Sequence, residues 1–203
     1  CFLHAHEHPD KLHTVGMTRQ PGLLRIVDEN MNDVAQGEIG ELIGWSPFMM
    51  TGYHNREDLT SESRHDDRQG RVWQRSGDMG KMDEDGFVIL LDRVKDMIIS
   101  GGFNVYAADI EAVIAKHDDV EDVGVIGIPS EEWGETPLGL VVRRASGTAS
   151  KDEIKDWANA KLGKGQRVSA IEFRAALPRS TIGKLLKREL REPYWRDHAT
   201  SVS

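Results

Sequence analysis

The sequence predicts an α+β fold in which a partial antiparallel β-subdomain is followed by a small α+β domain with a central sheet and flanking helices. Residues 22–92 alternate short apolar runs with Gly and Asp/Asn turn signals, which is typical of antiparallel strands. From about Asp96, β-branched runs alternate with segments of helical periodicity. With 203 residues, 38% of them hydrophobic, the chain can bury two small cores. We place the two domains at residues 1–92 and 93–203.

The first domain contains four predicted strands. Residues 23–27 and 40–45 are apolar runs separated by Asp and Asn turn residues. Residues 55–70 are polar and charged, which indicates a surface connection or a short helix. Strands resume at residues 71–75 and 87–91, and an Asp-Gly pair between them is a hairpin signal.

The second domain opens with a predicted tight hairpin, because Gly101 and Gly102 separate two short apolar runs. The stretch from Ser150 to Glu153 has the pattern of a capping box and predicts the start of a helix. A last helix is expected to follow Lys184. The remaining elements follow from periodicity and β-branched content: a helix at 109–117 and strands at 120–128, 138–142 and 171–177.

Composition excludes several function classes. A formal charge of −8 and a pI near 5.5 argue against nucleic acid as the main partner, because binding to phosphate backbones needs a dominant basic field. No apolar run approaches the ~20 residues that span a bilayer. The one cysteine, Cys1, cannot form an internal disulfide, so we expect a reducing, cytoplasmic location.

The opening segment carries His4, His6 and His8 at alternate positions. Such histidines can bind a metal, but the sequence offers them no Cys or His partner at ligand spacing. We therefore predict no metal site and interpret the segment as a flexible, exposed leader. Because the chain begins with Cys, we also expect it to be an excerpt of a longer protein.

Lys184 is the residue with the strongest chemical signal. It follows Pro178 and Gly183, so the backbone before it is turn-like, while Leu185, Leu186 and Leu190 predict an apolar helical face after it. A lysine at such a junction presents a point charge on a flexible stem to a phosphate or carboxylate. An ordinary solvated lysine is the alternative. Residues 174–191 also predict a local basic face, comprising Arg174, Arg179, Lys184, Lys187, Arg188 and Arg191.

Asp78 has a similar double interpretation. It follows a glycine at the end of a strand, where a carboxylate can accept hydrogen bonds from the two vicinal hydroxyls of a ribose. The alternative is an Asp that caps a turn. For Arg93 the choice lies between a ribose or phosphate contact and a surface ion pair.

Four segments taken together are far more specific than any one of them: residues 51–55, 75–80, 92–105 and 178–190. Their order and spacing resemble the C-terminal part of the adenylate-forming superfamily, which comprises acyl-CoA and aryl-CoA synthetases, adenylation domains of peptide synthetases and beetle luciferases. The resemblance covers the chain from about Gly16 to about Leu190.

The resemblance implies a role for each signal. Asp78 and Arg93 would bind the ribose and phosphates of ATP or AMP, and Lys184 would be the catalytic lysine of adenylation. Lys95 would be the hinge about which a mobile C-terminal domain rotates between two half-reactions. Gly101, Gly102 and Asn104 would belong to the loop that lines the CoA site during thioester formation.

The resemblance also implies a function. We expect the C-terminal part of an ATP-dependent carboxylic acid–CoA ligase for a fatty or aryl acid, with Mg²⁺-ATP and CoA as substrates and no tightly bound cofactor. As an incomplete fragment, with its N-terminal domain missing, the chain would be inactive alone. The sequence leaves the oligomeric state open, and a homodimer is one of the states considered. The alternatives are an adenylation domain of a peptide synthetase and a non-catalytic module that binds CoA or adenylate.

Overall fold

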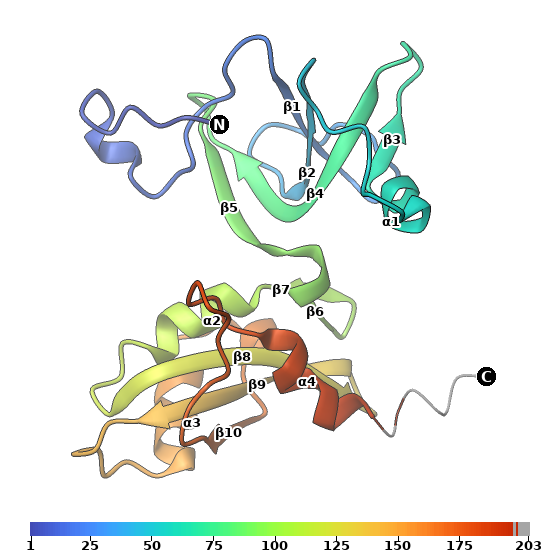
Figure 1. Cartoon of the computed structure of the whole chain (residues 1–203). Coiled ribbons are helices and arrows are strands. Elements are labelled where there is room, and N and C mark those ends of the chain that lie inside the picture. Colours follow the sequence, from blue (N-terminus) through green and yellow to red (C-terminus); the bar gives the residue numbers. More distant parts are fainter. Residues whose placement is uncertain (197, 199–203) are drawn as a thin grey trace. The chain divides into compact units, whose positions relative to one another are not determined.

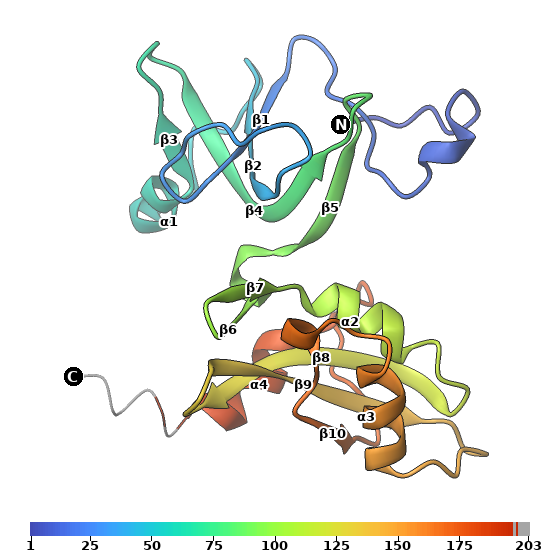
Figure 2. The same ribbon diagram turned by 180° about the vertical axis from the view of Figure 1, so that it is seen from behind.

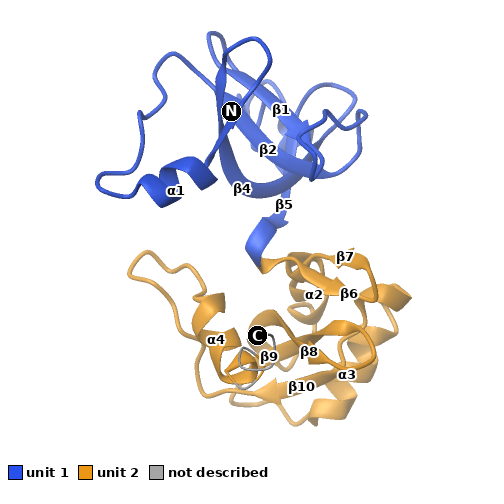
Figure 3. Cartoon of the chain, turned by 90° about the vertical axis from the view of Figure 1, so that its right-hand side faces the viewer, with its two compact units in different colours: residues 1–95 blue, residues 96–203 orange. Residues whose placement is uncertain are grey.

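The fold is described from a computed structural model of the chain, which Figures 1 and 2 show from opposite sides. The structure describes residues 1–196 and 198. The chain divides into two compact units, Cys1–Lys95 and Asp96–Ser203 (Figure 3). Within the described residues, every helix is too short or too polar to cross a membrane. The α+β class is confirmed, because both units combine a sheet with helices.

The first unit is built on an antiparallel sheet. Its strands lie in the order β1-β2-β4-β3, and β5 pairs with the far end of β4. The 55–70 segment holds both a short helix and a strand. The elements are η1 (Pro9–Lys11), β1 (Leu23–Val27), β2 (Gly40–Trp45), α1 (Glu57–Glu62), β3 (Arg64–Asp66), β4 (Val72–Met82) and β5 (Val88–Arg93).

Alternation along the strands gives this sheet a small core on each face. Ile26 and Leu42 pack with Val88 on one side, whereas their neighbours Val27 and Ile43 pack with Trp73 on the other. Successive strand residues point to opposite faces, so both members of each neighbouring pair are buried.

Most residues of the opening segment are exposed, as predicted for the leader, but specific contacts attach the segment to the sheet of the first unit. Phe2 forms an isolated bridge with Met17, and the His8 ring meets the Phe87 ring edge-on at a centroid distance of 4.9 Å. Lys11 Nζ lies 2.8 Å from Asp83 and 2.6 Å from Asp85, and these hydrogen bonds raise the pKa of Lys11. A local sequence pattern cannot show this attachment, because both aspartates lie more than 70 residues from Lys11, in the β4–β5 turn.

The second unit is a mixed sheet with helices on both faces. The strand order is β10-β9-β6-β7, and β8 also pairs with β9. The β10–β9 pair is parallel and the others are antiparallel. After η2 (Val94–Asp96), which spans the unit boundary, the elements are β6 (Ile98–Ser100), β7 (Phe103–Val105), α2 (Ala107–Ile114), β8 (Val120–Ser130), β9 (Gly134–Arg143), α3 (Lys151–Asn159), η3 (Lys164–Gln166), β10 (Ala170–Phe173) and α4 (Lys187–Trp195).

Two apolar clusters cover the faces of this sheet. Helices α2 and α3 pack over Val125 and Val141 on one face, and α4 packs over Ile126 and Leu140 on the other. Figure 1 accordingly shows α4 in front of the sheet, and Figure 2 shows α3 in front of it. The predicted capping box is confirmed, since the Ser150 hydroxyl accepts the Glu153 N–H and the Glu153 carboxylate accepts the Ser150 N–H.

Two predicted elements near the C-terminus were too long. The strand expected at 171–177 ends at Phe173, because Ile171 packs on the α2–α3 face whereas Leu177 packs on the α4 face. A continuous strand would place these two odd-numbered residues on the same face. The last helix starts at Lys187, so Leu185 and Leu186 precede it and do not belong to its apolar face.

Candidate functional site

Asp78 and Arg93 lie opposite each other on β4 and β5. They are partners in the strand register, and Arg93 Nε is 3.4 Å from Asp78 Oδ1. About a third of the Asp78 side chain and half of the Arg93 side chain remain exposed. The structure thus joins two residues that the sequence placed 15 positions apart. A carboxylate offers about four acceptor positions, so this pair leaves Asp78 able to accept hydrogen bonds from a diol.

A partly buried ion pair, which sequence reasoning missed, supports the strand that leads into Asp78. Glu41 on β2 is 7% exposed, and its Oε2 lies 2.5 Å from Arg75 Nη2. The same carboxylate accepts the Gly77 N–H at 3.3 Å, and its hydrogen bonds raise the pKa of Arg75. Gly77 has a φ of +71°, a conformation that favours glycine. Glu41 therefore holds the backbone just before Asp78.

Lys184 sits in a tight turn that precedes α4. Arg179 and Leu185 form an isolated antiparallel bridge, so the intervening chain folds back on itself. Ser180 N–H donates to the Lys184 carbonyl at 2.8 Å, and Lys184 N–H donates to the Ser180 hydroxyl at 3.1 Å. Gly183, with a φ of +81°, allows the reversal. The Lys184 ammonium makes no hydrogen bond or ion pair with any residue that the structure describes.

The predicted basic face was wrong in large part, because most of its cations are paired within the unit. Four of the six have a carboxylate neighbour, which composition alone does not reveal. Three of the four partners come from β8, α2 and β9, and the fourth, Glu172, lies two residues before its arginine. The pairs are Arg174–Glu172 at 2.8 Å, Arg179–Asp122 at 2.7 Å, Lys187–Glu111 at 2.9 Å and Arg191–Glu135 at 3.8 Å.

The predicted glycine hairpin forms between β6 and β7. Ser100 pairs with Phe103, and Gly101 and Gly102 between them have φ values of +57° and +81°. Two successive positive φ angles are the signature of a type I′ turn. Gly101 N–H donates to the Trp133 carbonyl at 2.8 Å, and a Cβ on Gly101 would lie 2.7 Å from the Trp133 ring. Around Gly102 there is open space within 4 Å, and Asn104 is exposed on β7.

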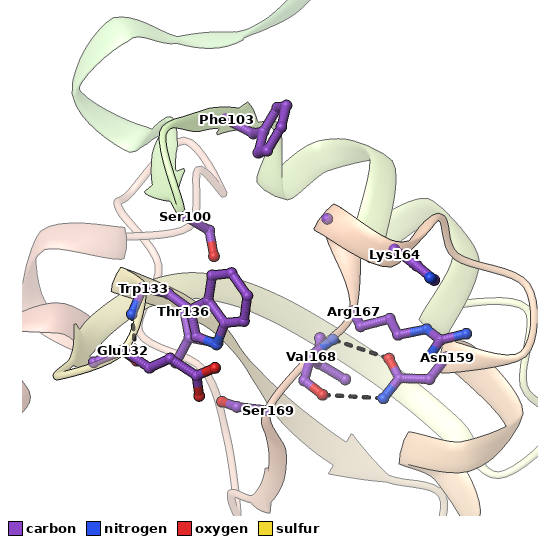
Figure 4. A pocket seen from close by; sticks show the side chains of 12 residues that line it. Ser100, Phe103, Glu132, Trp133, Thr136, Asn159, Lys164, Arg167, Val168 and Ser169 are labelled. Atoms are coloured by element: carbon purple, nitrogen blue, oxygen red, sulfur yellow. Dashed lines mark hydrogen bonds between the residues drawn. The ribbon is translucent and has the colours of Figure 1, made fainter.

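A pocket of about 680 Å³ lies beside this hairpin and was not predicted from the sequence. Figure 4 shows the Trp133 indole and the Phe103 ring on one side and Lys164 and Arg167 on the other. Asn159 holds the loop that carries the cations, since it accepts the Val168 N–H and donates to the Val168 carbonyl. Neither cation makes an ion pair with a described residue. The pocket thus combines aromatic faces with two cations, Lys164 and Arg167, and one carboxylate, Glu132.

The lysine turn and the glycine hairpin lie at opposite ends of β8. The turn is bound to Asp122 near the start of the strand, and Gly101 contacts Trp133 just beyond its end at Ser130. Eight residues separate Asp122 from Ser130, which at ~3.3 Å per residue is about 26 Å. Lys95, the predicted hinge, is the last residue of the first unit.

The histidines of the opening segment form only part of a cluster. Ligand atoms of His4, His6 and Glu7 lie within 4.8 Å of one another. The remaining histidine of the segment, His8, instead meets the Phe87 ring edge-on. The Arg19 guanidinium contacts His4 Nε2.

Comparison with known proteins gives consistent matches. The family described as AMP-binding enzyme C-terminal domain matches residues 109–184. A long-chain-fatty-acid–CoA ligase of Salmonella typhimurium is 40% identical over 168 residues, 83% of this chain and 29% of the relative. The ATP-bound crystal structure of MatB from Rhodopseudomonas palustris matches with a TM-score of 0.82 and 33% identity, covering 90% of this chain and 36% of MatB.

A second solved structure carries an intermediate. The o-succinylbenzoate CoA synthetase MenE from Bacillus subtilis, in complex with the acyl-adenylate OSB-AMP, matches with a TM-score of 0.80 and 31% identity. The match covers 93% of this chain and 37% of MenE. The chain thus spans about a third of the length of these relatives. It belongs to the adenylate-forming superfamily and corresponds to the C-terminal portion of that superfamily's acyl-CoA ligases.

Proposed function

We propose that the chain is the C-terminal part of an AMP-forming ligase that joins a fatty or aryl acid to CoA. In the first half-reaction, a carboxylate oxygen attacks the α-phosphorus of Mg²⁺-ATP and pyrophosphate leaves. In the second, the CoA sulfur attacks the acyl carbon, AMP leaves, and the thiol proton is released. Because the chain spans about a third of its relatives' length, both steps need residues from the remaining two thirds.

The separation of the lysine turn from the glycine hairpin is the observation that carries this proposal. The two segments lie about 26 Å apart along β8, so they cannot contact the same reacting atom in one arrangement. One rigid unit that presents first one end and then the other can serve two successive reactions. The division of the chain after Lys95 supports a hinge there. We therefore propose a β-subdomain, a mobile domain and rotation about Lys95, with the boundary at Lys95 instead of the 92/93 boundary expected from the sequence, because Arg93 belongs to β5 and pairs with Asp78.

The charge distribution supports the role of Lys184 in the first half-reaction. Its neighbours Arg179 and Lys187 are neutralised by carboxylates, whereas its own ammonium is free of described partners. A preorganised point charge can stabilise negative charge that develops between the carboxylate and the α-phosphate. Lys184 would act through its field and would not move a proton.

Asp78 and Arg93 are proposed to hold the nucleotide. The partly exposed carboxylate of Asp78 suits the two ribose hydroxyls, and Arg93, 3.4 Å away, suits an adjacent ribose or phosphate oxygen. Their cross-strand pairing keeps both side chains at the same point of the β4–β5 ribbon. A ligand that binds one of them therefore lies within reach of the other.

The pocket beside the glycine hairpin is proposed to bind the nucleotide end of CoA. The Trp133 indole offers a stacking surface for adenine, and Lys164 and Arg167 offer charge to phosphate. The hairpin, with Gly101, Gly102 and Asn104, would then guide the pantetheine arm. Since the pocket lies within the second unit, CoA binding is measurable on the 203-residue chain itself.

We expect Arg167→Ala to weaken CoA binding about 10- to 100-fold, because a charge-assisted hydrogen bond contributes ~1.5–3 kcal/mol. Isothermal titration calorimetry of the chain with CoA and dephospho-CoA checks this. Arg144→Ala is the matched control, because Arg144 is an exposed arginine outside the pocket. Equal losses in the two variants, or no binding of CoA by the parent chain, would contradict the assignment.

The function itself is tested by ATP–pyrophosphate exchange and by thioester formation with a panel of fatty and aryl acids. We expect both activities in a longer product of the same gene and neither in the 203-residue chain. Exchange without CoA transfer would favour the adenylation domain of a peptide synthetase. Absence of exchange with every acid, together with CoA binding, would favour a non-catalytic module.

A further inference from the structure

We propose that Asp122 and Gly124 on β8 are positioning residues that seat the lysine turn for adenylation. The two residues are separated by one position and so project to the same face of the sheet. Each holds one end of the bridged pair Arg179–Leu185 that closes the turn. This inference rests on the proposed role of Lys184.

The first anchor is an ion pair. Arg179 Nη2 donates to both carboxylate oxygens of Asp122, at 2.7 and 2.8 Å, which raises the pKa of Arg179. Its Nη1 donates to the Gly183 carbonyl at 2.8 Å, across the turn and one residue before Lys184. A single planar guanidinium thus links β8 to the residue that precedes the lysine. A lysine at position 179 has a single nitrogen, so it cannot reproduce the fork in which Nη2 bonds to Asp122 and Nη1 to the Gly183 carbonyl.

The second anchor is a packing contact. Leu185 lies against the open face of Gly124, where a Cβ would come within 2.7 Å of its methyl group. Leu177 and Leu190 complete the surroundings at 3.6 Å. A side chain at position 124 displaces the Leu185 methyl group from its place on the strand. Leu185 follows Lys184 directly, so this packing contact anchors the end of the turn that carries the lysine.

Beyond the turn, Lys187 Nζ lies 2.9 Å from Glu111 on α2, whose carboxylate also accepts the Val125 N–H at 2.8 Å. The turn is therefore fixed on both sides, while the Lys184 side chain itself is left unpaired. Such an arrangement limits the positions from which the ammonium can approach a phosphate. A misplacement of about 1 Å in a reacting group can cost on the order of a hundredfold in rate.

The first test uses the 203-residue chain. In Asp122→Asn, amide hydrogen exchange measured by NMR is expected to accelerate at least about tenfold at Ser180 and Lys184, whose N–H groups bond within the turn. Amides of β10 should keep their protection. Asp152→Asn is the control, because it breaks a comparable ion pair with Lys155 on α3, at 2.9 Å. Unchanged exchange at the turn would overturn the proposal.

The second test uses a longer gene product that is active in exchange. Asp122→Asn and Gly124→Ala should each lower kcat of ATP–pyrophosphate exchange about 10- to 100-fold, with KM for ATP and thioester formation from preformed acyl-adenylate retained. Arg179→Lys should give an intermediate loss. Equal loss of both half-reactions would indicate a merely structural role and overturn the proposal. If Lys184→Ala does not impair exchange, the proposed role of Lys184 fails. The anchoring of the lysine turn by Asp122 is still tested independently by the amide exchange measurement.

Discussion

Replacing Lys184 with alanine is expected to lower ATP–pyrophosphate exchange by about 10²- to 10³-fold in an active longer product, because one preorganised charge next to the α-phosphate would be lost. Thioester formation from preformed acyl-adenylate should persist, since the glycine hairpin lies at the other end of β8. The measurement is a pair of assays on one variant. Radiolabel exchange reports the first half-reaction, and CoA-dependent release of AMP from added adenylate reports the second.

Arg188→Ala provides the matched control for charge. Arg188 is exposed and lies four residues after Lys184. Its replacement by alanine removes the same formal charge as Lys184→Ala. If the local field alone mattered, the two variants would behave alike. A similar loss in Arg188→Ala, or a Lys184→Ala variant that impairs both half-reactions equally, would argue against a specific role in adenylation.

The second large effect is expected at Gly101. An alanine there must adopt a φ near +57°, at a cost of about 1–2 kcal/mol, and its Cβ would lie 2.7 Å from the rigid Trp133 ring. The hairpin or the indole has to move, and both border the pocket proposed for CoA. We therefore expect Gly101→Ala to slow thioester formation about 10- to 100-fold with adenylation intact. Single-turnover transfer from the acyl-adenylate to CoA measures this.

Gly102→Ala separates backbone strain from contact with Trp133. Gly102 has a comparable φ of +81°, but a Cβ at this position would meet no atom within 4 Å. Its alanine variant should therefore show the smaller loss. Equal losses at the two positions would mean that strain alone is responsible and that the indole does not define the CoA path.

Elements with local signals could be predicted from the sequence. The capping box at Ser150 involves residues three apart, and the glycine hairpin involves residues that adjoin. Apolar runs bounded by turn residues predicted β1 and β2 with the observed bounds. In each case the determining interactions lie within a few residues, so a linear pattern contains them.

Elements whose ends depend on distant packing were predicted less well. The start of α4 was placed too early because Leu185 belongs to the bridged turn and packs over Gly124, 61 positions before it in the chain. The strand after Ala170 was drawn too long because Leu177 crosses to the other face of the sheet. Both errors reflect tertiary contacts that override an apolar periodicity.

The sequence by itself determined the α+β class and the order of most elements, and it singled out Asp78, Arg93 and Lys184 as candidate site residues. Only the tertiary structure decided which charges are available. Arg179 and Lys187 read as members of a basic face, yet carboxylates on β8 and α2 neutralise them and leave Lys184 unpaired among the described residues. The physical reason is that ion pairs form between side chains that strand register and helix packing bring together, and neither is encoded in spacing along the chain.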